Sequence, residues 1–506
     1  MQRKQTYLFF VFAVLAGLLA GAALMVAASK RITGAAEKNS EVREALSVFS
    51  PEPVLPPDTD GFSISMLCDR SAFSYFSGQE EEGGALARRV WLRNAHLEAE
   101  TGSTLNTYLT SDFYADATAD ILSGDRVYNL YAADAARSLS KLLAAGHLVD
   151  TSDSAYIRQT LPWYDQNGMD ELSLFGQRFL ISSSALDARS GATVLLYNRS
   201  LLRTLENMEN TAMSLSASAL DGLFTLEELL AVSKTAAAAY AAPASAPTLL
   251  DELTVEPDTA KESALRAASN VLYEAGAPGD DAAFYGLSFG SEHTFALYSA
   301  LGGSFAESTS DTPAVSVSLD ALRETLFGVI SLSLEASVTV HSSAFENAGA
   351  LFGVAKLSEI ETVKTAISDI GLLPMPKPGE KDEYRCFVDL RGTPVMAIPD
   401  GAADMDKLEY LIDRMAFLSY GYIEPLLRQN LTQGNPDDMQ VLELIYDSAI
   451  YDLANLFGYG SIERLLSDAL EKGTAENLTL DYYNRQTLYE KAFEIIGKRL
   501  SKPPDA

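Results

Sequence analysis

The sequence predicts an α/β fold built on a parallel sheet, and residues 112–202 show the pattern most clearly. An acidic, alanine-rich helical run spans 112–124, a short apolar alternation at 127–131 is typical of a strand, and a second helix covers 135–145. Each helical run ends at a glycine, as a left-handed position just beyond a helix requires. A strand between two helices indicates a βαβ unit, in which ligands bind beyond the carboxyl ends of the strands.

The N-terminal residues predict a membrane segment followed by a tether. The run from Tyr7 to Ala28 carries no charge, and at ~1.5 Å per residue it extends roughly 33 Å, enough to cross a bilayer. We expect residues 1–31 to be an uncleaved anchor or, as the alternative, a signal peptide cleaved after Ala20-Gly-Ala22. The proline-rich residues 32–60 then form a stiff, extended tether.

The remaining elements follow in chain order. Residues 62–68 alternate like a strand, and 84–101 form a helix that ends at Gly102. Residues 201–268 are alanine- and serine-rich and predict helices with an insertion, while 283–297 predict strand, turn and helix. Amphipathic patterns predict the last helices, at 404–419, 437–457, 462–472 and 482–500.

Five short motifs occur in order within residues 62–460. They are Ile121–Leu130, Leu142–Asp150, Phe175–Leu180 with Val194–Leu202, Leu301–Phe305, and Ile370–Lys377. In this order they resemble motifs of the bacterial extracellular solute-binding proteins of ABC importers, of the sugar-binding, maltose-binding-protein-like type. Asn129 stands where that family usually has aspartate.

The resemblance implies a two-lobed periplasmic-binding-protein-like fold with discontinuous lobes, extra C-terminal helices and one preceding transmembrane helix. Lobe 1 would comprise residues 61–182 and 345–395, and lobe 2 residues 183–344 and 396–506. The chain would cross between lobes near 180–184, 340–345 and 394–398. The family fold would bring Cys68 and Cys386 into lobe 1, where they form a disulfide or, as we favour, stay as two buried thiols.

Candidate ligand-binding residues lie at expected strand ends and loops around the cleft between the lobes. Trp163 offers an aromatic face for a sugar ring, or is simply packed. The arginines could donate to hydroxyls or carboxylates, or form ordinary ion pairs. Ser291 could cap a helix whose free amides hold an anion or a hydroxyl group. The full set is Arg70, Tyr131, Asp134, Trp163, Ser183, Ser291, Glu292 and Arg391.

Composition argues against several classes of function. The 506 residues carry a formal net charge of −31, which repels a phosphate backbone, so we expect no nucleic-acid partner. Two cysteines are too few for a disulfide framework, and the four histidines lie far apart in the sequence, so we expect neither a metal site nor a cofactor.

Gly286-Leu-Ser288-Phe-Gly290 matches the nucleophile elbow of serine hydrolases, and Asp320 and His341 follow in the required order. Glycine and serine are common residues, so the match is weak. We therefore keep a hydrolase using Ser288 as the least favoured function and expect no enzyme.

The resemblance implies capture of a small solute, most simply an oligosaccharide, by hinge closure of a monomer that delivers it to a separate ABC permease. The protein would be anchored in the cell membrane with its bulk outside. A peptide or a polyamine stays open as the solute, the latter favoured by the acidity. The alternative is a membrane-anchored sensor or scaffold of the same fold.

Overall fold

The computed structural model of the 506-residue chain describes residues 56–79, 83–205, 208, 211–241, 284–307, 313–458, 461–473 and 478–500. The chain divides into two compact units, Met1–Pro56 and Pro57–Ala506. The expected anchor or signal and nearly all of the tether lie outside the described residues. No helix within the described ranges is long and apolar enough to cross a bilayer.

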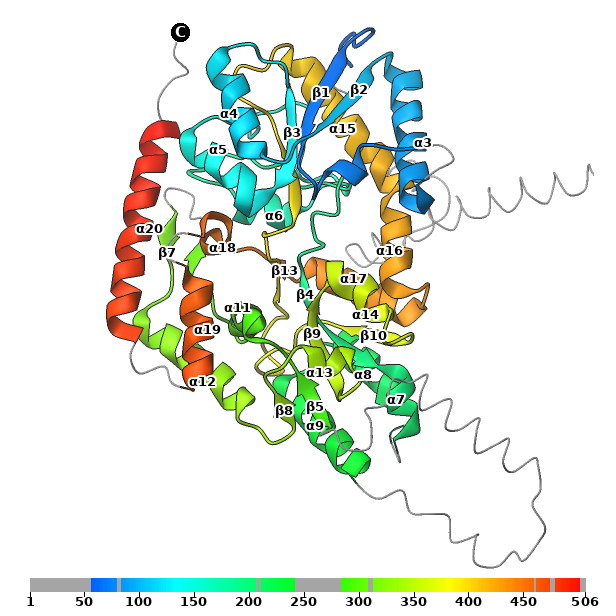
Figure 1. Ribbon diagram of the computed structural model, residues 1–506, viewed down its shortest axis with the longest axis vertical. Coiled ribbons are helices and arrows are strands. Elements are labelled where there is room, and N and C mark those ends of the chain that lie inside the picture. Colours follow the sequence, from blue (N-terminus) through cyan, green and yellow to red (C-terminus); the bar gives the residue numbers. More distant parts are fainter. Residues whose placement is uncertain are drawn as a thin grey trace, which may run out of the picture. The chain divides into compact units, whose positions relative to one another are not determined.

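Two sheets organise the second unit, which is mixed α/β as predicted (Figure 1). The first sheet has the order β12-β3-β1-β2. Its strands β1 (Ser63–Cys68), β2 (Thr104–Leu109) and β3 (Leu130–Asp134) are parallel, and β12 (Pro394–Ala397) runs antiparallel to β3. The carboxyl ends of β1 and β3 therefore lie at one edge.

The second sheet has the order β10-β4-β9-β5-β8. Strand β5 (Tyr285–Ser288) runs parallel to both β8 (Val338–Thr339) and β9 (Ala350–Lys356), whereas β4 (Thr193–Asn198) is antiparallel to β9 and to β10 (Ile370–Leu373). The carboxyl ends of β5, β8 and β9 consequently share one edge.

Helices surround both sheets. On the first sheet lie α3 (Gly84–Thr101), α4 (Phe113–Ser123), the π-helical turn η2 (Ala135–Leu139), α5 (Ser140–Ala145) and α15 (Met405–Tyr422). The other elements, in chain order, are η1 (Phe73–Tyr75), α6 (Gln166–Glu171), α7 (Arg199–Thr204), α8 (Thr211–Leu220), α9 (Leu226–Ala241), η3 (Ser291–His293), α11 (Thr294–Ala300), β6 (Ala306–Glu307), β7 (Ala314–Val315), α12 (Leu319–Ser333), α13 (Ser343–Glu346), η4 (Leu357–Glu359), α14 (Ile360–Lys364), β11 (Cys386–Phe387), α16 (Glu424–Thr432), α17 (Pro436–Asp447), β13 (Ala449–Ile450), α18 (Leu453–Phe457), α19 (Ile462–Lys472) and α20 (Thr479–Leu500).

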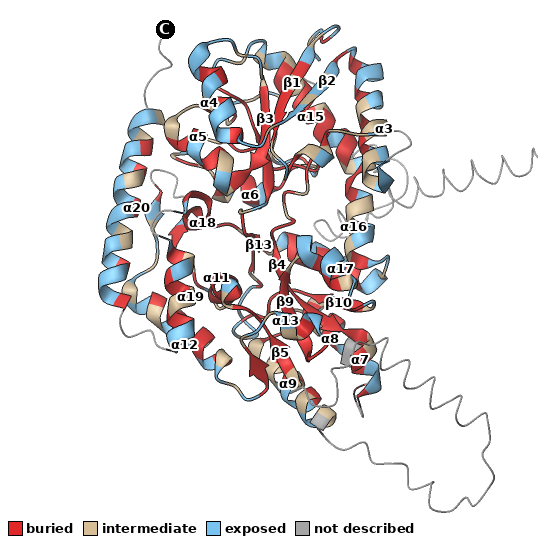
Figure 2. Ribbon diagram, viewed as in Figure 1, coloured by how far each residue is buried: buried red, intermediate tan, exposed pale blue. Residues whose placement is uncertain are grey.

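Alternation along the first sheet sends its side chains into two different apolar cores. Met66 and Ala132 face a core shared with α3 and α15, whereas Leu67 and Tyr131 face one shared with α4 and α5. The second of these cores continues into the five-stranded sheet and its helices (Figure 2). Apolar packing therefore connects the two sheets as well as stabilising each one.

The chain crosses between the two sheets three times. Two crossings are adjacent extended segments, and the third is the junction between helices α15 and α16. Ile181 pairs with Met396 beside the first sheet, and Ala192 pairs with Val388 beside the second. Segments 182–192 and 388–393 therefore run side by side. The third passage lies between α15, which packs against the first sheet, and α16 and α17, which lead to β10.

The pairing differs from the predicted lobes at residues 345–395. Strands β9 and β10 were expected in lobe 1 but belong to the second sheet, because both pair with β4. No crossing occurs near 340–345, since β8 and β9 flank the same strand β5. Likewise Met396 and Ala397 of β12 and the whole of α15, expected in lobe 2, belong to or pack on the first sheet.

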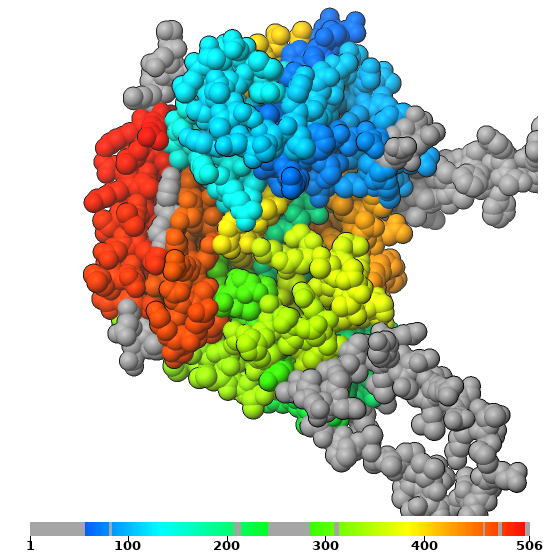
Figure 3. All heavy atoms as spheres, in the orientation of Figure 1, coloured from blue at the N-terminus to red at the C-terminus, as the bar shows by residue number. Residues whose placement is uncertain are grey.

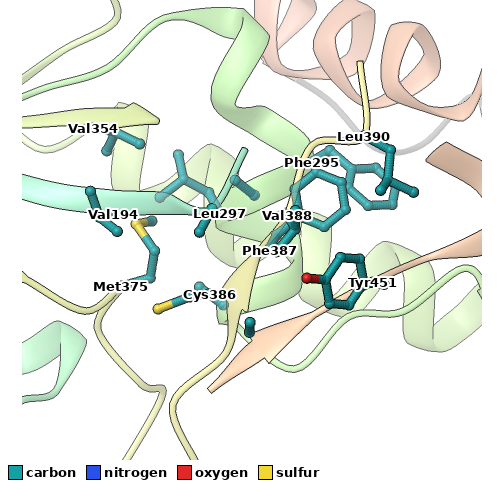
Figure 4. Packing of buried hydrophobic residues seen from close by; sticks show 14 of the residues in the cluster. Val194, Phe295, Leu297, Val354, Met375, Cys386, Phe387, Val388, Leu390 and Tyr451 are labelled. Carbon is teal, nitrogen blue, oxygen red and sulfur yellow. The ribbon is translucent and has the colours of Figure 1, made fainter. Parts of the chain in front are cut away.

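Cys68 and Cys386 are free and buried, which rules out a disulfide between them. Cys68 lies in the first sheet, and Cys386 lies in the short strand β11, which pairs with β13. Figure 4 shows Cys386 among apolar side chains that include Phe387, Val194 and Met375. Both thiols thus behave as small core residues, in agreement with the favoured prediction.

A substitution at Gly353 tests the packing between β9 and the short helix α13. A Cβ added at this glycine would collide with the ring of Phe345, which is itself buried. We expect Gly353→Ala to lower the free energy of unfolding by about 2 kcal/mol, because the core must shift to accept the methyl group. Urea denaturation measures this change.

The matched control is Gly421→Ala in α15, where an added Cβ meets nothing within 4 Å. Alanine should be neutral or stabilise that helix by up to about 1 kcal/mol. Equal effects of the two substitutions would contradict the described contact between β9 and α13.

Candidate functional site

A polar cavity lies at the carboxyl ends of β5, β8 and β9, the edge of a parallel arrangement where ligands commonly bind. It has a volume of about 150 Å³. Its walls come from η3 after β5, the residues after β8, the end of β9 with η4 and α14, and the crossing segment at Asp389 and Arg391. The lining residues are Glu292, His293, Ser342, Phe345, Glu346, Val354, Ala355, Lys356, Glu359, Val363, Asp389 and Arg391.

Asp389 is the centre of the hydrogen bonding in this cavity. Its side chain is only 5% exposed. It accepts hydrogen bonds from Lys356 Nζ at 2.6 Å, from Arg391 Nε at 2.9 Å and from Asn455 Nδ2 at 3.0 Å. Burial alone would raise the pKa of this carboxyl, but Arg391 and Lys356 outweigh burial and hold it below its usual value. The carboxylate therefore stays charged and fixes both bases.

Arg391 connects Asp389 to a second acid. Its Nη1 lies 2.9 Å from Glu463 Oε2, and Glu463 also accepts from Asn455 Nδ2 at 2.6 Å. Arg391 is therefore held by two carboxylates rather than left free for a ligand. Asn455 completes the network by donating to both acids while its Oδ1 accepts from Leu390 N at 2.7 Å.

The adjoining residue Gly392 connects this network to the first sheet. Its N–H donates to Asp134 Oδ2 at 2.6 Å, and Asp134 also caps η2 by accepting from Arg137 N at 2.7 Å. The Asp134 N–H in turn donates to Asp69 Oδ2 at 2.8 Å. The ends of β1 and β3 therefore lie next to the crossing segment that lines the cavity.

His293 lines the cavity from η3 and is nearly buried. The Gly290 N–H donates to its Nδ1 at 3.1 Å, so the ring proton resides on Nε2. Burial lowers the pKa of His293 against the nearby Glu292 and Glu359 carboxylates, which raise it. The imidazole is thus neutral, with one fixed tautomer.

Arg391 and Glu292 are the two predicted binding residues that the cavity includes. Asp134 lies at the adjoining strand end, but its carboxylate is occupied by backbone N–H groups. Ser291 does not cap the helix as expected, because Gly290 takes that position. Arg70 is exposed, and it is the second residue after β1.

The structure places Tyr131 and Trp163 away from the cavity. Strand β3 begins at Leu130, three residues after the predicted start, so Tyr131 falls inside the strand, fully buried against Phe113. Trp163 is half-buried and donates from Nε1 to Asp413 Oδ1 of α15 at 2.9 Å. Both side chains therefore serve packing in this structure, which for Trp163 agrees with the alternative prediction.

The hydrolase prediction is wrong in its geometry. Ser288 is fully buried, and its hydroxyl donates to the backbone carbonyl of His341 at 2.7 Å. A nucleophilic serine needs an imidazole nitrogen at that position and an open surface. Asp320 lies at the start of α12 as an exposed residue. The Ser288, Asp320 and His341 set therefore forms no triad.

A second, smaller cavity of about 20 Å³ lies beside the first crossing segment, with room for about one water molecule. Ser183, another predicted binding residue, lines it. Here the Arg189 guanidinium lies 3.9 Å from the Tyr446 ring centroid and 3.7 Å from Glu424 Oε1. Burial raises the pKa of Asp187 to about 6, although Arg189 lowers it. The site is too small for a solute and is a buried charge cluster.

Sequence reasoning missed His293, Lys356, Asp389 and Glu463. Lys356 directly follows the apolar run of β9, which is a signal for a strand end that could have been used. Asp389 and Glu463 are far apart in a chain rich in acids, so nothing in the sequence relates them. Within the described residues no group of three or more His, Cys, Asp or Glu side chains could hold a metal ion.

Replacing Asp389 tests the network around the cavity. Asp389→Asn should lower the free energy of unfolding by about 2 kcal/mol near neutral pH, because Lys356 and Arg391 lose their shared counter-charge. The folded pKa of Asp389 is depressed, so its contribution is present above the ordinary aspartate pKa of ~3.9 and is lost as pH falls below it. The difference between variant and parent should therefore shrink in acid.

The control for Asp389→Asn is Asp170→Asn, which breaks an exposed pair with Arg178 at 3.3 Å. It should change the free energy of unfolding by less than about 1 kcal/mol. Urea denaturation at several pH values measures both variants. Similar losses in both, or a loss that grows in acid, would contradict the role given to Asp389.

Asp187, which is partly buried, gives the opposite pH dependence. Its folded pKa of about 6 lies above the unfolded value of ~3.9, so the folded state binds the extra proton and stability falls as pH rises through that window. Asp187→Asn removes this term. Relative to the parent, the variant should gain roughly 2 kcal/mol on going from pH ~4 to pH ~8. Thermal unfolding across this range measures it, and a relative loss would show that Asp187 is stabilised as a carboxylate.

Comparisons with known proteins find likeness among solved structures. No family model matches the chain, and no curated protein matches it. Among solved structures, the chain is similar to the GacH receptor of Streptomyces glaucescens, with 13% sequence identity and a TM-score of 0.45. The alignment covers 85% of this chain and 98% of that one. Structures of the GacH receptor show it unliganded and in complex with acarbose and an acarbose homolog.

Proposed function

We propose that this chain is a solute-binding protein that captures a small polar solute without altering it. The observation that carries the proposal is the cavity at the carboxyl edge of the second sheet, built from strand ends and from the crossing segment at Asp389 and Arg391. The same segment contacts the carboxyl end of β3 through Asp134. A solute in this cavity would therefore lie close to polar groups of both sheets.

The cavity favours hydrogen bonding over stacking. Phe345 is the one aromatic residue among those that line it, apart from the His293 imidazole, and the acids and bases around it supply acceptors and donors. A polyhydroxylated solute, such as a carbohydrate, matches such a lining because each hydroxyl both donates and accepts. Carbohydrate is accordingly the solute class that we propose first, before a peptide.

Capture would follow the arrangement of the crossings. Segments 182–192 and 388–393 lie side by side and connect the two sheets. We propose that the chain bends there, so that the end of the first sheet closes over the solute. Closure is favoured only by contacts that the closed state alone makes with the solute. We further propose a monomer, tethered by residues 1–60 with its bulk outside the cell, that delivers the solute to an ABC permease.

One observation favours the alternative of an anchored sensor or scaffold. Helix α20 contacts elements of both sheets: Tyr482 Oη donates to Val317 O beside α12, and Arg499 Nη1 donates to Ala144 O at the end of α5. A helix that contacts elements of both sheets limits how far the two sheets can move apart. Neighbouring genes would discriminate the two functions, since an importer requires a permease and a sensor requires a signalling partner.

A ligand panel on the full chain tests capture. Sugars, peptides and polyamines are screened by thermal shift, and a solute at 100 times its Kd should stabilise the fold by about 2.7 kcal/mol. For any solute that binds, Glu292→Gln should weaken binding about tenfold, because Glu292 lines the cavity with a 59% exposed side chain. Calorimetry measures the Kd.

Trp163→Phe is the matched control, since this indole contacts α15 rather than the cavity. It should leave the Kd of the bound solute unchanged. Binding that depends on Trp163 but not on Glu292 would place the site elsewhere, and an absence of any binding solute would overturn the proposed function.

A further inference from the structure

The charges that line the cavity do not balance. Its lining contains two bases, Lys356 and Arg391, and four acids. Both bases are already held by Asp389, and Arg391 also by Glu463. Positive charge is therefore neutralised within the protein before any solute arrives. An anionic solute would have to compete with buried carboxylates for these bases, which disfavours it.

Three of the four acids pair with no lysine or arginine within the described residues, and one of them, Glu359, accepts a hydrogen bond from the Lys356 backbone N–H at 2.9 Å. Glu346 is exposed on α13 and takes part in no described ion pair. Glu292 is folded back over Gly290, where a Cβ would collide with its carboxylate. The nearest nitrogen of a titratable base to Glu292 is His293 Nδ1 at 4.0 Å, and that atom accepts a backbone hydrogen bond. Glu292 and Glu346, like Glu359, thus line the cavity without a counter-charge.

His293 supplies a donor that nothing in the described residues uses. Its side chain is 7% exposed, and it lines the cavity. Because Nδ1 accepts from the Gly290 N–H, Nε2 carries the proton, and no described residue accepts from it. This N–H is therefore available to an oxygen acceptor of a solute in the cavity.

We propose that the cavity selects a solute in which a protonated amine lies close to an oxygen acceptor, such as an amino sugar. The amine would face Glu292 and Glu346, and the oxygen would accept from His293 Nε2. This inference rests on the proposed function and narrows its solute class. It attributes the preference for an amine to the acids that line the cavity, and not to the acidity of the whole chain, which carries a formal net charge of −31.

Three disaccharides that differ only at C2 of their two rings test the proposal on the full chain. Chitobiose with free amines, its N,N′-diacetyl form and cellobiose carry amines, amides and hydroxyls, respectively, at these carbons. Calorimetry at about pH 6 gives the three Kd values. We expect the free amine to bind at least about tenfold more tightly than either neutral sugar, and the preference to weaken with added salt.

Charge variants locate the origin of this preference. Glu346→Gln should reduce the preference for the amine about fivefold. Glu98→Gln on α3, an exposed acid that does not line the cavity, changes the net charge equally and should leave the preference intact. Equal effects of the two variants would assign the preference to the acidity of the whole chain and overturn the proposal.

A pair of variants isolates the histidine donor. His293→Asn places an amide oxygen near the position of Nδ1, which keeps the bond from Gly290, but it has no donor at the position of Nε2. His293→Gln keeps a donor there. We expect about tenfold weaker binding of the amine-bearing sugar by the asparagine variant and a change within about threefold for the glutamine variant. The reverse order would overturn the role of Nε2.

The outcomes separate this inference from the proposed function. If a neutral sugar or a peptide binds as tightly as the amine-bearing sugar, capture stands and the amine selectivity is wrong. If spermidine binds with the same dependence on Glu346 but without dependence on His293, the site takes cations and the oxygen acceptor is wrong. If none of these solutes binds, both conclusions fail.

Discussion

The buried carboxylate of Asp389 is the constraint on which the rest of the site depends. It holds Lys356 at the end of β9 and Arg391 on the crossing segment, and it accepts from Asn455 of α18. Leaving either base there without this acid would be strongly unfavourable. The carboxylate therefore fixes the position of the crossing segment relative to the second sheet. Thr393 Oγ1 holds the same segment by donating to Asp389 O at 2.6 Å.

The same segment limits how the two sheets can move. Gly191 approaches the Asp389 carbonyl so closely that a Cβ would collide with it, so the two crossing segments are held together as a pair. On one flank α15 and α16 meet at Ile423, and on another α20 extends from α12 to α5 (Figure 1). Figure 3 shows the blue and cyan residues, from the early part of the described chain, meeting green and yellow residues of its middle part along one boundary. Motion between them would have to bend the paired crossings and both helical connections together.

The sequence predicted local structure well where a single residue type decides it. Gly102, Gly124 and Gly146 end α3, α4 and α5 in the left-handed conformation. The strand β3 was predicted three residues early, because the apolar alternation at 127–131 begins in a loop where Asp120 Oδ1 accepts from Val127 N. That small shift moved the inferred strand end from Asp134 to Tyr131 and gave the wrong site residue.

Long-range pairing was beyond the reach of single-sequence reasoning. The strands β9 and β10 carry no local sign of which sheet they join, because both are apolar and almost fully covered. The ion network joins residues 356, 389, 455 and 463, whose contact depends on the completed fold. Of the cavity's polar residues, only Arg391 and Glu292 were recognised. Arg391 was recognised from its position near an expected crossing and Glu292 from its position in an expected strand–turn–helix segment, rather than from any partner.

The motif Gly286-Leu-Ser288-Phe-Gly290 shows how a catalytic pattern can arise from packing alone. Gly286 is required because Ser233 of α9 packs directly against its backbone. A Cβ at residue 286 would collide with Ser233. Ser288 donates to the His341 carbonyl just after β8, which also accepts from the Ala344 N–H at 3.0 Å. Gly290 leaves room for the Glu292 carboxylate and gives its N–H to His293. Every fixed position of the motif therefore has a structural cause, and the last of them sets the tautomer of the histidine that faces the cavity.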